Sequence, residues 1–72
     1  MKGIVGPVDW DQQGNITVIA LFVHGEKQYL ISNDSKGKEL FKYNGSSVKV
    51  NGYTQQDSKK KYTLFVEQYE LL

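Results

Sequence analysis

Three adjacent lysines, Lys59, Lys60 and Lys61, are the most concentrated chemical feature of this 72-residue chain. They lie in a polar segment, residues 55–61, between two strand-like runs. Neighbouring ammonium groups can follow the phosphates of a nucleic acid backbone. A lysine run in a turn can also simply keep a hairpin solvated and free of edge pairing. The run alone therefore predicts a basic loop, and a nucleic-acid role needs support from other residues.

Aromatic rings near the expected hairpins are the second candidate feature. Trp10 adjoins the first polar turn, Tyr29 lies in a strand-like run, and Tyr62 follows the lysines. Unpaired bases stack on exposed rings, and each stack contributes about 1–3 kcal/mol. Rings can instead close the ends of a small barrel, and we expect about half of the aromatic residues in the core. Trp10 and Tyr62 are predicted to be exposed because each adjoins a polar turn. The candidate ligand-binding residues are thus Trp10, Tyr29, Lys59, Lys60, Lys61 and Tyr62.

Residues 9–16 copy the first half of a calcium loop. Carboxylates stand at positions one and three (Asp9 and Asp11), an amide oxygen at five (Gln13) and a glycine at six. Position twelve, where a bidentate glutamate should close the site, is Ala20, and the flanking segments are strand-like rather than helical. We therefore predict a polar hairpin turn and no metal site here.

The residue set does not favour catalysis. His24 is the single histidine and there is no cysteine, so a nucleophile held by a second group is not evident. No glycine-rich phosphate loop occurs either. We expect a protein that is not an enzyme and that has no cofactor.

Charge and composition limit the classes of partner that the chain is expected to bind. Nine basic residues, all lysine, oppose eight acidic ones, for a formal net charge of +1. Without arginine, tight sequence-specific recognition of nucleic acid is disfavoured, and the near-balance gives little long-range steering. No apolar run approaches the roughly 20 residues of a membrane helix, so no membrane insertion is expected. Two compartments fit: the cytoplasm, slightly favoured because no signal-like segment begins the chain, and an exported location after removal of a signal.

Hydrophobic alternation and turn residues place the elements that must position these side chains. Five strands are predicted, with one short helix between the third and fourth. Gly6–Pro7 and Gly52 are expected to bend their strands, and the alternation of the last strand slips near residues 67–68, which predicts a bulge. The predicted strands are residues 2–9, 16–23, 27–32, 47–54 and 62–71, and the predicted helix is residues 35–43.

The strand at residues 16–23 is apolar on both faces. Ile19 and Leu21 alternate with Val18, Ala20 and Phe22. One face must line the core. The other is either covered by another part of the chain or a partner, or it is an exposed apolar surface.

The order β-β-β-α-β-β is that of the OB-fold, a five-stranded Greek-key barrel. One all-β domain over residues 1–72 is expected. The chain resembles small bacterial OB-fold domains of the uncharacterised or nucleic-acid-binding-like kind. The resemblance rests on residues 3–5, 9–15, 39–45, 48–52 and 64–66 and on Tyr69. An SH3-like barrel is the alternative, and it would put its helical turn between strands four and five.

Two functions follow as hypotheses. The first is a non-catalytic binding module for single-stranded nucleic acid with little sequence preference, since OB-folds use the loop between strands four and five on ligands. The alternative is a protein-interaction or structural domain, in the cytoplasm or exported, that contacts a protein partner or a second copy through residues 16–23.

Overall fold

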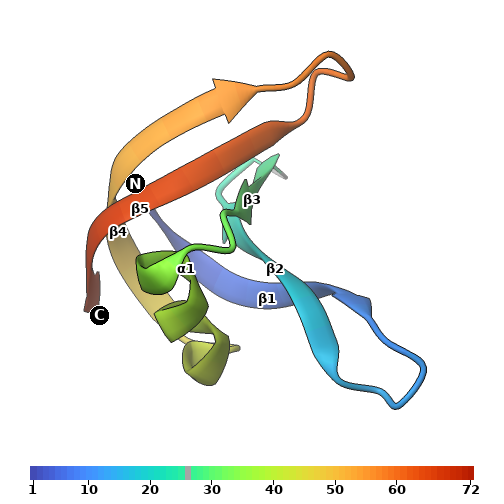
Figure 1. Ribbon diagram of the computed structural model, residues 1–72. Coiled ribbons are helices and arrows are strands. Elements are labelled where there is room, and N and C mark those ends of the chain that lie inside the picture. The colour runs from blue at the N-terminus through green and yellow to red at the C-terminus, as the bar shows by residue number, and fades with distance from the viewer. Residues whose placement is uncertain (26) are drawn as a thin grey trace.

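Five strands close into a barrel in the order β1-β2-β3-β5-β4 in the computed structural model, which describes residues 1–25 and 27–72 (Figure 1). Helix α1 and the 3-10 helix η1 lie between β3 and β4, so the predicted fold class is confirmed and the SH3-like alternative is wrong. The elements are β1 Lys2–Trp10, β2 Ile16–Val23, β3 Lys27–Ile31, α1 Ser35–Glu39, η1 Leu40–Tyr43, β4 Ser47–Gln56 and β5 Tyr62–Leu71. The connection between the predicted strands at residues 16–23 and 27–32 includes Glu26, which lies outside the described residues.

The barrel closes through one short parallel seam. Strands β3 and β5 pair in parallel over Leu30–Thr63 and Ile31–Leu64, whereas the other neighbouring strands pair antiparallel. Beyond this seam, the start of β3 has no pairing with β5. The β4–β5 hairpin and the β1–β2 loop both extend past the barrel, at the upper right and the lower right of Figure 1.

Bulges bend the long strands where the sequence indicated. In β1 the pairing shifts between Pro7 and Asp9, so the extra residue is Val8, next to the predicted bend. In β5 the shift skips Glu67, which confirms the bulge predicted from the slipped alternation. Gly52 faces this second bulge, and a Cβ there would collide with the carbonyl oxygen of Phe65.

The core is aliphatic. Every strand contributes buried aliphatic side chains, at alternate positions in β2, β4 and β5, and Leu40 from η1, which is fully buried, joins them. No aromatic ring among the described residues is fully buried, so the prediction that about half belong to the core is wrong. The interior of a five-stranded barrel is narrow, and branched aliphatic side chains fill it. Four half-buried rings instead pack around it: Tyr29, Phe41, Tyr43 and Tyr69.

The short helix is held by side-chain contacts at both ends. The Asp34 carboxylate accepts hydrogen bonds from the Gly37 N–H at 2.9 Å and from the Ser32 hydroxyl at 2.8 Å. These two bonds lower the pKa of Asp34. At the other end, the Tyr69 hydroxyl donates to the Glu39 carboxylate at 2.8 Å, which ties the helix to β5. Among the described residues, no helix is of a length and apolarity suited to crossing a membrane.

Candidate functional site

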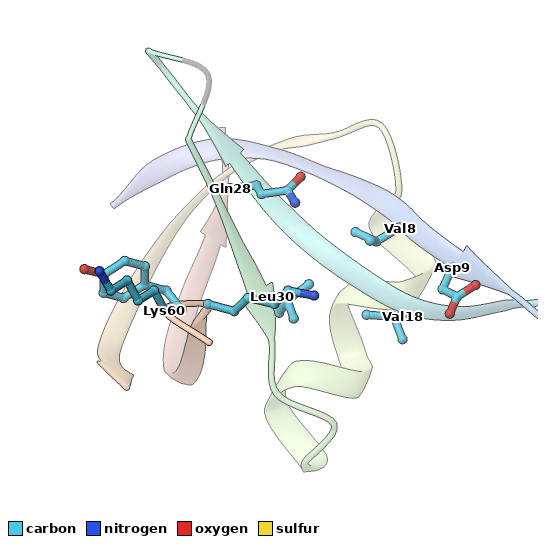
Figure 2. A pocket seen from close by; sticks show the side chains of 8 residues that line it. Val8, Asp9, Val18, Gln28, Leu30 and Lys60 are labelled. Atoms are coloured by element: carbon cyan, nitrogen blue, oxygen red, sulfur yellow. The ribbon is translucent and has the colours of Figure 1, made fainter. Parts of the chain in front are cut away.

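A cleft of about 440 Å³ lies on the outer surface of β1, β2 and β3, beneath the loop that joins β4 to β5 (Figure 2). Val18 and Leu30 form part of its lining because their neighbours Ile19 and Ile31 point the other way, into the core. Its surface therefore combines apolar side chains with charged ones. The lining residues are Val8, Asp9, Val18, Gln28, Leu30, Lys60, Lys61 and Tyr62.

Residues 57–61, here called the lysine loop, form a turn that is stabilised by hydrogen bonds to Asp57. One oxygen of the Asp57 carboxylate accepts the N–H of Lys59 at 2.8 Å and that of Lys61 at 2.9 Å. The Asp57 backbone adds bonds to Lys60 and Lys61. The turn therefore fixes the backbone from which Lys60 and Lys61 project into the cleft.

The loop between β1 and β2 has the same hydrogen-bond pattern. The Asp11 carboxylate accepts the N–H groups of Gln13 and Asn15, both at 2.9 Å, as Asp57 does in the lysine loop. The bonds from Asn15 are the main reason that the pKa of Asp11 is lowered. This carboxylate holds together the polar turn that the sequence predicted. No cluster of three or more potential metal-binding side chains occurs in residues 1–25 and 27–72.

Counted from Asp11 in the first loop and from Asp57 in the second, the fourth residue has a left-handed backbone in both loops, but its type differs. In the first loop it is Gly14, with φ of 86°, and in the second it is Lys60, with φ of 63°. Lys60 is the one non-glycine residue with positive φ in the described part of the chain. A residue with a Cβ is strained there by about 1 kcal/mol relative to glycine. The lysine loop thus has a cleft-lining lysine at the position where the β1–β2 loop has glycine.

Tyr62 forms a ridge between the cleft and a second hollow. Its ring packs against Tyr29, with centroids 5.6 Å apart and planes tilted by 56°. The second hollow, about 380 Å³, is lined by Lys27, Gln28, Tyr29 and Tyr62. Tyr62 is 42% exposed, so part of its ring is accessible to a planar ligand.

Asp9 gives the cleft a negative group apart from the lysines. Because Val8 is the extra residue of the β1 bulge, Val8 and Asp9 both line the cleft instead of alternating across the strand. One oxygen of the Asp9 carboxylate accepts the N–H of Trp10 at 2.9 Å. Figure 2 shows Asp9 and Lys60 at opposite sides, with Leu30 between them.

The structure brings together four of the six predicted site residues. Lys60, Lys61 and Tyr62 line the cleft, and Tyr29 contacts Tyr62 from the adjoining hollow. Lys59 is exposed in the loop but is outside the cleft lining. Trp10 is 52% exposed, as predicted, but it lies at the end of β1 beyond the lining.

Sequence reasoning missed the part of the cleft contributed by β1, β2 and β3. Val18 belongs to the second apolar face of the strand at residues 16–23, which is the signal that should have indicated it. The sequence predicts Asp9 in the polar turn, because it does not show how the bulge directs this side chain into the cleft. Gln28 and Leu30 had no distinguishing pattern.

An apolar patch adjoins the cleft on the same outer surface. Ile4 and Phe22 are cross-strand partners, 49% and 40% exposed, and both line a shallow hollow with Leu72 and His24. The Phe22 ring lies over Gly6, where a Cβ would approach it to 2.7 Å. The second face of β2 is thus partly covered by the chain and partly exposed.

Comparison with known proteins adds no functional assignment: no protein-family model, curated protein sequence or solved structure matches this chain.

Proposed function

We propose that this chain is a non-catalytic binding module of the OB-fold type that holds single-stranded nucleic acid in the cleft beneath the β4–β5 loop. The strand order and the position of the helix support the fold assignment. The observation that carries the function is that Lys60, Lys61 and Tyr62 line one cleft over an apolar floor.

The mechanism combines two contacts. The ammonium groups of Lys60 and Lys61 neutralise neighbouring phosphates and release counterions. Bases stack on the accessible part of the Tyr62 ring and lie over Leu30 and Val18. Neither contact distinguishes one base from another, so binding has little sequence preference. Its affinity is modest and depends on salt.

The backbone of Lys60 supports a role for this loop. Strained residues persist where the surrounding structure or the function retains them, and they gather at ligand sites. Asp57 fixes the turn, so glycine at position 60 would form the same loop without strain. A lysine at this position lowers the stability of the fold, but it places a positive charge in the cleft.

Fluorescence anisotropy with a labelled oligothymidylate of about twelve nucleotides, at about 20 mM salt, tests the proposal. We expect saturable binding that weakens as salt rises. The double variant Lys60→Gln/Lys61→Gln should lose most of the affinity, and its slope of log K against log salt should fall by about 1.4. The matched control is Lys38→Gln/Lys49→Gln, which removes the same charge from exposed positions outside the cleft. Absence of binding at low salt, or equal loss in both double variants, would contradict the proposal.

The exposed patch of Ile4, Phe22 and Leu72 favours a second candidate function, protein interaction. Light scattering over a concentration series tests it for a second copy of the chain. Under this alternative the mass rises with concentration, and Ile4→Thr, which keeps a β-branched side chain, abolishes the rise. A constant monomer mass would exclude self-association through this patch.

A further inference from the structure

The charges of the cleft are arranged with two signs, not one. Lys60 and Lys61 come from the β4–β5 loop, whereas Asp9 comes from the bulge of β1. The apolar side chains of Val18 and Leu30 complete the floor. A uniformly basic groove would accept a phosphate anywhere along its width, but this cleft does not, because Asp9 repels one.

This arrangement orients a bound strand. Its phosphates lie at the lysines, where they are neutralised, and its bases extend across the floor with their edges toward Asp9. The Asp9 carboxylate has one oxygen bonded to the Trp10 N–H. Its other oxygen has no hydrogen-bond partner within the described residues, and the bonded oxygen keeps a second lone pair, so both oxygens can accept from donors on a base edge.

An ionised carboxylate accepts hydrogen bonds and cannot donate them. Guanine is the base whose Watson–Crick edge offers two adjacent donors, N1–H and the N2 amino group, in a spacing that two carboxylate oxygens can match. Cytosine and adenine offer one amino group beside a ring nitrogen that repels the carboxylate. Thymine and uracil offer a single N–H between two carbonyl oxygens. The chemistry therefore ranks guanine first.

We propose that Asp9 is a specificity-determining residue that selects guanine at one position of the bound strand. This inference rests on the proposed function and adds one preferred base to an otherwise broad affinity. Contacts of this bidentate kind separate right from wrong bases by about 5- to 160-fold in affinity.

The test compares three labelled strands of about eight nucleotides: oligothymidylate, the same strand with one central guanine, and the same strand with inosine there. Inosine keeps N1–H and lacks the N2 amino group. We expect the guanine strand to bind at least about fivefold more tightly than oligothymidylate, with inosine between them. In Asp9→Asn the affinities for the three strands should become equal. Any overall rise should be shared by all three, because the variant loses a negative charge that repels phosphate. Glu70→Gln, a matched loss of an exposed carboxylate outside the cleft, should leave the ranking intact.

The outcomes separate the two proposals. Binding of all three strands with equal affinity would overturn the selection of guanine and leave the nucleic-acid function standing. A guanine preference that survives Asp9→Asn would overturn the role of Asp9. Failure of all three strands to bind would remove the proposed function and this inference with it.

Discussion

Tyr29 and Tyr62 contact each other at the point where the pairing of β3 with β5 stops. The parallel seam runs through Leu30–Thr63 and Ile31–Leu64, and the two tyrosines precede the first pair on each strand. Their ring centroids are 5.6 Å apart, so the two residues that the same parallel register would pair next are in contact through their side chains. Side-chain packing thus continues the closure of the barrel, and it places Tyr62 at the rim of the cleft.

Tyr62→Ala should therefore weaken both ligand binding and the barrel. We expect affinity for single-stranded nucleic acid to fall by about 5- to 160-fold through loss of a base stack. Stability should fall by about 0.5–1.5 kcal/mol through loss of the ring pair. Tyr62→Phe, which keeps the ring, should leave both nearly unchanged. Anisotropy and urea unfolding measure the two effects, and an Ala variant with unchanged affinity would exclude Tyr62 from the site.

Replacing the strained lysine should have opposite effects on stability and binding. Lys60→Gly relieves the positive φ, so unfolding should become less favourable by about 0.5–1 kcal/mol, while affinity falls because a cleft cation is lost. Lys59→Gly is the matched control, since Lys59 lacks a positive φ and lies outside the cleft lining. That variant should lose stability and keep most of its affinity. If Lys60→Gly bound as tightly as the parent chain, the strain would have no functional counterpart.

The barrel was predictable because its signals are local. Alternation placed a strand at residues 47–54, in which Val48 and Val50 are buried, and the slipped alternation near residues 67–68 predicted the β5 bulge. Such features depend on one strand and its own sequence.

The cleft was less predictable because it depends on pairing between distant segments. Asp9 reaches it through a bulge whose register is set by β2, and the left-handed backbone of Lys60 follows from hydrogen bonds to Asp57. Gly37 is a further case: it weakens a helix by propensity, yet a Cβ there would collide with the Ser32 carbonyl oxygen. No periodicity in the sequence reports such a close approach.

Alkaline pH should weaken the tie between the helix and β5. The hydrogen bond to Glu39, with desolvation, raises the pKa of Tyr69 to about 12. A raised pKa means that the contribution is fully present below the unfolded value of about 10 and is lost as pH rises toward 12. The stability difference between the parent chain and Tyr69→Phe should therefore be constant at neutral pH and shrink between pH 10 and 12. A difference that did not change over this range would show that the hydroxyl bond does not form in solution.

The close approach of β4 to β5 at the bulge should make position 52 intolerant of any side chain. A Cβ at Gly52 would collide with the Phe65 carbonyl oxygen, which is backbone and cannot rotate away. Gly52→Ala should therefore lower the free energy of unfolding by about 1–3 kcal/mol, as overpacking does elsewhere. Asn51→Ala, an exposed neighbour on the same strand, should change it by no more than about 0.5 kcal/mol. Urea unfolding of the two variants decides the matter, since equal stabilities would mean that the strands can separate at the bulge without cost.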